Sequence, residues 1–376
     1  MPLISIVMPS MNEEKTIEIC MRKALAVIED FGCEGEIIVV DNSNDKTAEI
    51  ASSMGAIVIK SVIGYGNAYI EGLSHAKGDY IAIADADNTY DLLELPKFFD
   101  ALISDKADFV IGSRLKGKIQ SGAMPLLHRY IGNPILTKLL NLCFKLNISD
   151  AHCGMRAFTK DALKKMKLKA HGMEMASEMI IEAADKGLRI MEVPITYSVR
   201  DAPSKLRSFQ DGWRHLRFIM LYRPVPFILF PGMFVFLLGL FLTTTIIMKG
   251  NVEDTKLHSF ILGSMLLVIG SQILATGLYL KAYGFVHGIY GREDSFIKKL
   301  LDYHSLEKEL LVGIMFVAIG IFLGGRIMLT WIHSGYGSML EIESAVMAMV
   351  LSAIGLQMIF TSIFLSVLML DLNTDR

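Results

Sequence analysis

Two aspartates separated by one residue, Asp85 and Asp87, are the strongest chemical signal in the sequence. They follow an apolar run at residues 80–84 that predicts a buried strand. Ligands bind to open α/β sheets at the carboxyl ends of the strands. Carboxylate oxygens bind hard cations such as Mg²⁺, which also bind phosphate oxygens. The pair therefore predicts a divalent-metal site that would neutralise a departing diphosphate, whereas Asp91 is expected to cap the next helix.

Two further polar segments follow predicted strands and are expected at the same edge of the sheet. Residues 9–13 (Pro-Ser-Met-Asn-Glu) follow the first strand, and residues 41–45 (Asp-Asn-Ser-Asn-Asp) follow the second. Each alone is also typical of a turn. Together with Asp85 they place three polar strand ends on one edge, where a carboxylate such as Asp41 would accept hydrogen bonds from a base or ribose.

Alternating strands and helices are expected to hold these segments in place. Five short apolar runs predict buried strands, at residues 3–8, 36–40, 56–59, 80–84 and 108–111. Helical patterns lie between them, at residues 13–30, 45–54, 66–75 and 92–104. This alternation predicts an α/β domain, with a mostly parallel sheet covered by helices on both faces.

The composition separates this domain from an apolar second half. The chain has 376 residues, of which 52% are hydrophobic, and its mean hydropathy of +0.43 is high for a soluble enzyme. The net charge of −2 argues against a nucleic-acid partner. The four cysteines form no CxxC pair, so the sequence predicts neither a zinc site nor a disulfide.

Four apolar stretches predict transmembrane helices, at about 225–248, 258–280, 310–332 and 345–370. Basic residues gather before the first stretch and in the loop between the second and third. The positive-inside rule therefore predicts a multi-pass protein of the cell membrane, with the catalytic domain and both termini in the cytoplasm. The expected domains are 1–200, an amphipathic interfacial helix at 201–223, and the membrane region 224–376. Residues 126–146 form a second segment with an apolar face and basic edges.

These motifs, in this order, resemble family 2 glycosyltransferases of the GT-A fold, and among them the dolichyl- or polyprenyl-phosphate mannose and glucose synthases. The resemblance covers residues 3 to about 222. Its donor-side motifs are 9–13, 39–43 with Asp45 and Thr47, 64–68, 78–80, 85–87 and 112–114. Residues 150–156 (Asp-Ala-His-Cys-Gly-Met-Arg) are similar to the acceptor-side motif, and residues 204–206 resemble the loop that closes over the site.

The resemblance implies a role for each matching residue. The nucleotide-sugar site would contain Pro9, Met11, Glu13, Val40, Asp41, Asp85, Ala86, Asp87, Arg114, Glu178, Arg200 and Lys205. Asp85 and Asp87 would bind Mg²⁺ or Mn²⁺. Arg129 and Arg156 would bind the acceptor phosphate, and the catalytic residues would be Asp87, Arg114 and Arg129. Arginine suits these roles because its planar fork matches phosphate oxygens in pairs.

The expected function is the inverting, metal-dependent transfer of one hexose or N-acetylhexosamine from a nucleotide sugar to dolichyl or polyprenyl phosphate. The product would be a lipid-phosphate-sugar donor for protein or cell-surface glycosylation. A phosphate acceptor is already anionic and needs no general base. The site must instead offset the repulsion between two anionic groups, and a metal ion with several arginines and lysines can do this. Membrane lipid is a further expected partner, and the spans would suit a homo-oligomer.

Departures from the family pattern bear on the donor. Many mannose synthases follow the two aspartates with Leu-Gln and then His, and that glutamine helps to bind the metal. Here the corresponding residues are Asn88, Thr89 and Tyr90, and Met11 replaces a common aromatic residue. These changes favour a UDP-sugar over a GDP-sugar.

Two other functions remain open from the sequence. A processive polysaccharide synthase would share the domain and the spans, but its Gln-x-x-Arg-Trp motif is present only in a wrong order at residues 210–214. A non-enzymatic scaffold or flippase for lipid-linked sugars would not need the complete set of acidic and basic strand ends.

Overall fold

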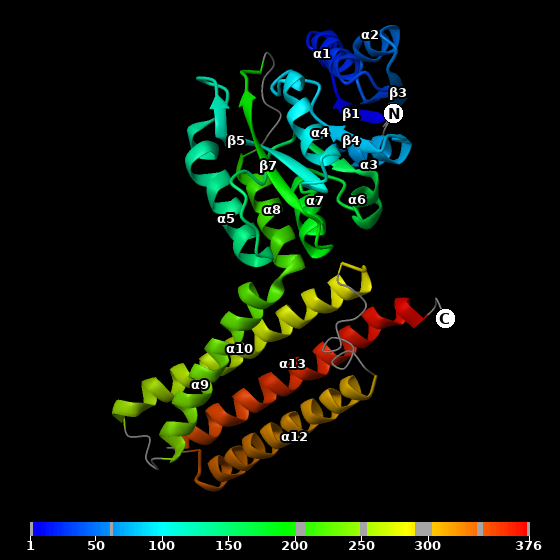
Figure 1. Cartoon of the computed structure of the whole chain (residues 1–376). Helices are drawn as coiled ribbons and strands as arrows, with labels where there is room; N and C mark the ends of the chain where they lie inside the picture. Colours follow the sequence, from blue (N-terminus) through cyan, green and yellow to red (C-terminus); the bar gives the residue numbers. More distant parts are fainter. Residues whose placement is uncertain are drawn as a thin grey trace. The chain divides into compact units, whose positions relative to one another are not determined.

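The structure is a computed structural model that describes residues 3–60, 63–200, 208–248, 254–289, 303–336 and 341–373 (Figure 1). The chain divides into two compact units, Met1–Ile219 and Met220–Arg376. The first unit is built on a seven-stranded sheet. The second consists of helices that are long and apolar enough to cross a membrane.

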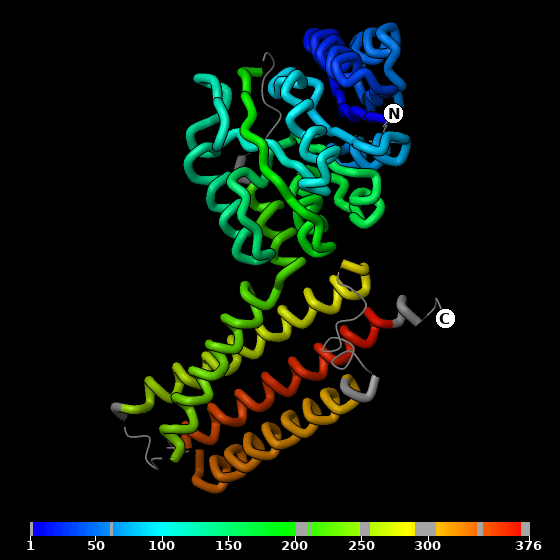
Figure 2. The backbone as a smooth tube through the Cα atoms, in the orientation of Figure 1, coloured from blue at the N-terminus to red at the C-terminus, as the bar shows by residue number. Residues whose placement is uncertain are grey.

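The sheet of the first unit confirms the predicted mostly parallel topology. Its strands are β1 (Ile4–Ser10), β2 (Gly35–Asp41), β3 (Ile57–Lys60), β4 (Tyr80–Ile83), β5 (Phe109–Ile119), β6 (Arg156–Thr159) and β7 (Ile190–Tyr197). Their order is β3-β2-β1-β4-β6-β5-β7. Only β6 runs antiparallel to its neighbours within this sheet. Figure 2 shows β7 beside β5, although the two are far apart in the sequence.

Strands β6 and β7 were not predicted, and both lack the apolar runs of the other strands. Strand β6 has only four residues, Arg-Ala-Phe-Thr. Strand β7 carries Glu192 and Pro194 and lies at the edge of the sheet, where a proline is tolerated because its missing N–H faces away from the ladder.

The helices of the first unit follow the predicted alternation. They are α1 (Ile17–Asp30), α2 (Thr47–Ser53), α3 (Tyr65–His75), η1 (Leu92–Glu94), α4 (Pro96–Ile103), η2 (His128–Gly132), α5 (Asn133–Phe144), α6 (Lys160–Lys165), α7 (Met175–Asp185) and α8 (Ser208–Tyr222). The predicted helix 92–104 is divided by Pro96, and Asp91 caps its first turn as expected, accepting the N–H of Leu93.

Helix α3 packs very closely against the sheet, and this packing positions residues of the site. A side chain at Gly72 would place its Cβ 2.5 Å from Val7 Cγ1 on β1 and 2.7 Å from Val40 Cγ2 on β2. Only glycine therefore allows this approach. The same helix carries Tyr65 and Tyr69, whose hydroxyl groups reach the ligand-binding edge.

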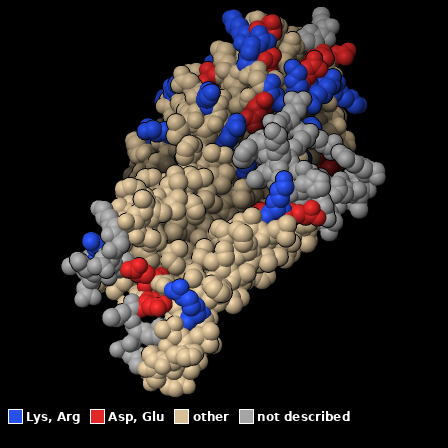
Figure 3. Space-filling view, turned by 90° about the horizontal axis from the view of Figure 1, so that it is seen from below, with Lys and Arg blue, Asp and Glu red and all other residues tan. Residues whose placement is uncertain are grey.

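The second unit confirms the four predicted apolar helices. Its elements are η3 (Val225–Leu229), α9 (Phe230–Met248), α10 (Asp254–Val286), α12 (Tyr303–His333) and α13 (Ile342–Asn373). The membrane-spanning segments are Val225–Met248, Lys256–Val286, Leu306–His333 and Ile342–Met369. Figure 3 shows a broad surface in this region with few charged side chains.

Small residues bring these helices together in pairs. A Cβ on Gly270 of α10 would lie 2.5 Å from the backbone N of Phe236 on α9, and one on Gly355 of α13 would lie 2.7 Å from the carbonyl oxygen of Gly313 on α12. Close backbone approach at small residues is typical of helix packing in membranes. Arg326 lies 3.6 Å from Glu341 near the ends of α12 and α13, so its charge is paired.

Candidate active site

The carboxyl edge of the sheet lines a cavity of about 540 Å³ in the first unit. Nine predicted site residues line it: Pro9, Met11, Glu13, Val40, Asp85, Ala86, Asp87, Arg114 and Arg200. The expected convergence of three polar strand ends is therefore present. Lys205, with the predicted closing loop 204–206, lies outside the described residues.

The ends of β1 and β2 form one end of the cavity. The buried carboxylate of Asp41 accepts hydrogen bonds from the hydroxyls of Ser10 and Ser43, each at 2.6 Å. It thus ties the two strand ends together. Its neighbours Val40 and Asn42 line the cavity, whereas Asp41 itself is not part of the lining.

The two aspartates after β4 are held by different partners. Oδ1 of Asp85 accepts hydrogen bonds from the hydroxyls of Tyr65 at 3.0 Å and Tyr69 at 3.2 Å. Oδ1 of Asp87 accepts the N–H and the hydroxyl of Thr89 at 3.1 and 2.6 Å. Burial, and then the charge of Asp87, raise the pKa of Asp85 above its usual range.

This pair fits a divalent cation. Both tyrosines use the same oxygen of Asp85, which leaves Oδ2 for another ligand, and a cation would relieve the repulsion that raises the Asp85 pKa. Within the described parts of the chain, no group of three His, Cys, Asp or Glu side chains could hold a metal. A cation here would therefore complete its coordination from phosphate oxygens and water, as Mg²⁺ commonly does.

Arg200, just after β7, connects two parts of the cavity. Its Nη2 lies 2.5 Å from Glu13 Oε1, and its Nε lies 3.4 Å from Asp87 Oδ2. The guanidinium thus adds positive charge beside the acidic pair and lies near the residues that follow β1.

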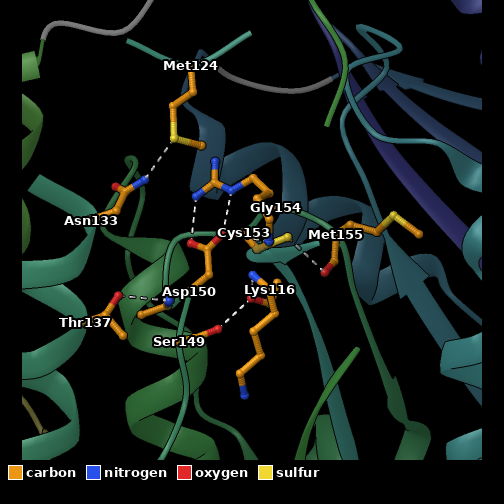
Figure 4. Close-up of polar contacts among 12 residues, drawn as sticks. Lys116, Met124, Asn133, Thr137, Ser149, Asp150, Cys153, Gly154 and Met155 are labelled. Atoms are coloured by element: carbon orange, nitrogen blue, oxygen red, sulfur yellow. Dashed lines mark hydrogen bonds and ion pairs between the residues drawn. The ribbon is translucent and has the colours of Figure 1, made fainter. Parts of the chain in front are cut away.

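A buried ion pair holds Arg114 in the cavity wall. Asp150 is fully buried and accepts the backbone N–H, Nε and Nη2 of Arg114 at 3.1, 2.7 and 2.8 Å. In Figure 4, dashed lines join the labelled Asp150 carboxylate to the guanidinium group. A two-pronged pair of this kind fixes the guanidinium in one orientation.

Two residues expected to contact ligands are instead buried beneath the site. Arg156 is 1% exposed and donates to the carbonyl oxygens of Cys153 and Ala151. It shapes the acceptor-side loop from below, so the expected contact with an acceptor phosphate is corrected. Glu178 is also 1% exposed, and its carboxylate accepts the N–H groups of Lys169 and Ala170. We correct its expected nucleotide contact in the same way.

Arg129 lies on η2, beside the cavity. Its guanidinium is 5.3 Å from the ring of Tyr130, and the preceding residue, His128, lines the cavity. The predicted contact of Arg129 with an acceptor phosphate stays a prediction.

Several residues of the site were missed from the sequence. Tyr65 and Tyr69 bind Asp85 from 20 and 16 residues away in the chain. Tyr90 accepts the N–H of Gly154 at 2.8 Å. Tyr65 lies within the 64–68 motif, and Tyr90 follows the two aspartates. Neither feature of the sequence showed where the hydroxyl group would point.

Gly154 tests how closely the acceptor-side loop must approach Asp85. A Cβ at this position would lie 2.9 Å from Asp85 Oδ2 and 3.2 Å from the Tyr90 hydroxyl. We expect Gly154→Ala to displace the carboxylate and lower the transfer rate by about 10-fold or more, since errors near 1 Å cost up to about 10²-fold. Steady-state rates would measure this. Gly122→Ala is no matched control because its φ is +81°. Gly324→Ala on α12 serves instead, because nothing lies within 4 Å of the added carbon and the residue is not part of the cavity lining.

The comparisons with known proteins agree with this architecture. Residues 5–167 match the sequence model of glycosyl transferase family 2, and residues 278–369 match that of the glycosyltransferase family 2 C-terminal transmembrane region. The solved structure of mannosyl-3-phosphoglycerate synthase from Rubrobacter xylanophilus is similar with a TM-score of 0.50 at 20% identity, covering 60% of this chain and 74% of that one. This likeness shows the GT-A fold.

Two curated proteins of Haloferax volcanii are similar over long stretches. The low-salt glycan biosynthesis hexosyltransferase Agl6 is 40% identical over 371 residues, covering 97% of this chain and 88% of that protein. A dolichyl-phosphate hexose transferase is 32% identical over 210 residues, covering 56% of this chain and 89% of that protein. The fold and the site thus define a membrane-bound glycosyltransferase. The chain belongs to glycosyl transferase family 2.

Proposed function

We propose that this enzyme transfers one hexose or N-acetylhexosamine from a nucleotide sugar to dolichyl or polyprenyl phosphate. The observation that carries the proposal is a single cavity that contains both the carboxylates of Asp85 and Asp87 and the fixed cation of Arg114. The similarity to a dolichyl-phosphate hexose transferase supports the choice of acceptor. The product would be a lipid-phosphate-sugar donor for glycosylation of proteins or the cell surface.

The order of the strands supports a separate position for each part of the donor. The nucleoside would bind where β1 and β2 end, near Pro9, Met11 and Val40. The diphosphate would follow beside Asp85 and Asp87, after β4. Mg²⁺ or Mn²⁺ held by these two carboxylates would supply positive charge to the departing diphosphate. Met11 offers a flexible apolar surface to the base, and we favour a UDP-sugar.

The reaction needs no general base. An oxygen of the lipid phosphate forms a bond to the anomeric carbon while the bond to the nucleotide diphosphate breaks, and the electron pair leaves with the diphosphate. Attack from the opposite side inverts the anomeric centre. The chain's own task is to bring two anions together, and Arg114 and Arg200 provide charge that screens their repulsion.

An exposed apolar face supports a lipid acceptor. Large apolar side chains on the segment 126–142 point to solvent: Leu126, Leu127, Tyr130, Ile131, Ile135 and Leu142. His128, Asn133 and Leu136 from the same segment line the cavity. An element that exposes apolar side chains and also lines the site suits contact with the bilayer interface. We propose a cell-membrane location with the catalytic unit and both termini in the cytoplasm.

The proposal is tested with the purified full-length protein in detergent. Dolichyl phosphate, Mg²⁺ or Mn²⁺ and a panel of UDP- and GDP-sugars are supplied, and lipid products are identified by mass spectrometry. We expect one sugar per lipid phosphate from one preferred donor, an inverted linkage, and no product with EDTA. Dolichol without phosphate is the matched control acceptor and should stay unmodified, because its hydroxyl would need a base. A sugar polymer would instead indicate a processive synthase.

A further inference from the structure

His152, in the loop before β6, has two buried ring nitrogens that no described residue hydrogen-bonds. It lines the cavity, and both ring nitrogens are shielded from solvent without a hydrogen bond to any residue that the structure describes. Leaving such a group unpaired is unfavourable. Because the unpaired nitrogens face a ligand cavity, we expect a bound ligand to supply the missing hydrogen bonds.

The position of His152 along the sheet edge indicates which part of the ligand it meets. Strand β6 lies between β4 and β5, and its antiparallel direction brings the loop before it to the carboxyl edge. The loop approaches the acidic pair through Gly154, which lies against Asp85. His152 therefore lies on the side of Asp85 away from β1 and β2. A nucleotide whose base is at β1 and β2 would extend its sugar toward this side.

The ring is held in place before any ligand binds. It packs edge-on against His215 of α8, with ring centroids 4.5 Å apart, and His215 Nδ1 is 2.8 Å from the Ser177 hydroxyl on α7. Arg156 donates hydrogen bonds to the carbonyl oxygens of Ala151 and Cys153, the residues on either side of His152. Binding to a side chain fixed in this way loses little conformational freedom.

The protonation state of the His152 ring indicates which kind of ligand group can be its hydrogen-bond partner. Burial, then the neighbouring His215 and Arg114, lower the pKa of His152 well below its usual value, so the ring is neutral. A neutral imidazole has one donor and one acceptor nitrogen. A sugar hydroxyl both donates and accepts, whereas a phosphate oxygen would use only the donor.

We propose that His152 hydrogen-bonds a hydroxyl of the transferred sugar and thereby selects the sugar. This rests on the proposed function in that the ligand is a nucleotide sugar. His152 is on this account a specificity residue, distinct from Asp85, Asp87 and Arg114.

His152→Phe is a sharp test because it keeps a ring against His215 and removes both nitrogens. With the full-length enzyme, kcat/KM for the preferred donor should fall roughly 10- to 100-fold, as expected for a lost hydrogen bond of this kind. Analogues of the donor that lack one sugar hydroxyl are then compared. One analogue should be poor for the wild type yet hardly affected by His152→Phe, because the partner is already missing.

Binding measurements separate this idea from the choice of acceptor. Calorimetry should show that His152→Phe lowers the affinity for the nucleotide sugar by the same factor. The affinity for the free nucleoside diphosphate should change by less than about 2-fold. His152→Gln, which keeps a donor and an acceptor, should recover part of the loss. His75→Phe at the exposed end of α3 is the control for the substitution and should behave as wild type.

Three outcomes would overturn the proposal. The first is an equal fall in kcat/KM for the preferred donor and for every deoxy analogue. The second is a loss of affinity for the free nucleoside diphosphate equal to that for the nucleotide sugar. The third is an unchanged affinity for the nucleotide sugar in a folded variant. If no lipid product forms with any donor but His152→Phe still weakens only the nucleotide sugar, the acceptor assignment fails while the role of His152 stands.

Discussion

Asp87→Asn is expected to lower the rate of sugar transfer by roughly 10²- to 10³-fold, the usual cost of one electrostatic contact to a developing charge. Asp87 faces the cavity, where its Oδ2 lies 3.4 Å from Arg200. The asparagine keeps the size of the side chain and removes the charge that a cation at the diphosphate needs. Single-turnover rates with the preferred donor and dolichyl phosphate would measure the loss.

Asp91→Asn is the matched control for this change. Asp91 lies four residues further on, where it caps η1 and pairs with Lys23 at 2.9 Å, outside the cavity lining. Asparagine is also a good cap, so the rate should change by less than about 2-fold. Equal losses in the two variants would mean that the charge of Asp87 has no special part in catalysis.

The second large effect is on stability. Asp150→Ala should destabilise the first unit by about 3–5 kcal/mol, because Arg114 would keep its charge in a buried place without a partner. Arg114 and Asp150 have side chains that are 8% and 0% exposed, so solvent cannot take over that role. For a domain of this size the apparent Tm should fall by roughly 6–20 °C, which a thermal scan of the full-length protein in detergent would show.

The double variant Arg114→Met with Asp150→Leu separates folding from catalysis. Replacing both charges by apolar side chains of similar size is often neutral for stability. We expect most of the Tm to return while transfer stays severely reduced, since the cavity has lost Arg114. A double variant as unstable as Asp150→Ala would show that the pair's hydrogen bonds, and not an unpaired charge, dominate.

The sequence was a good guide where one physical rule acts alone. Buried parallel strands need apolar runs, and membrane helices need about 20 apolar residues, so the first five strands and the four spans could be predicted. Strand β6 is short and contains Arg156, and β7 is an edge strand that carries Pro194. Their places depend on pairing with strands far away in the chain, which no local pattern reveals.

The site shows the same division. Asp85 and Asp87 were identified because they directly follow a strand, and strand ends share one edge. Whether a charged side chain in a loop points into the cavity or beneath it depends on contacts across the fold. Arg156 and Glu178 were therefore assigned to ligands although both bind backbone, and Tyr65 was missed although it holds Asp85.

The surroundings of Glu178 have a consequence for how mutations in this enzyme should be interpreted. Its carboxylate holds the N–H groups of Lys169 and Ala170, and the next carbonyl oxygen, that of His171, accepts the N–H groups of Gly66 and Asn67 at the start of α3. Helix α3 in turn holds Asp85 through Tyr65. Contacts through residues 169–171 and helix α3 thus connect Glu178, which is not part of the cavity lining, to a carboxylate that is. An inactive Glu178 variant would report on the alignment of Asp85, and would not by itself identify a residue that touches the nucleotide.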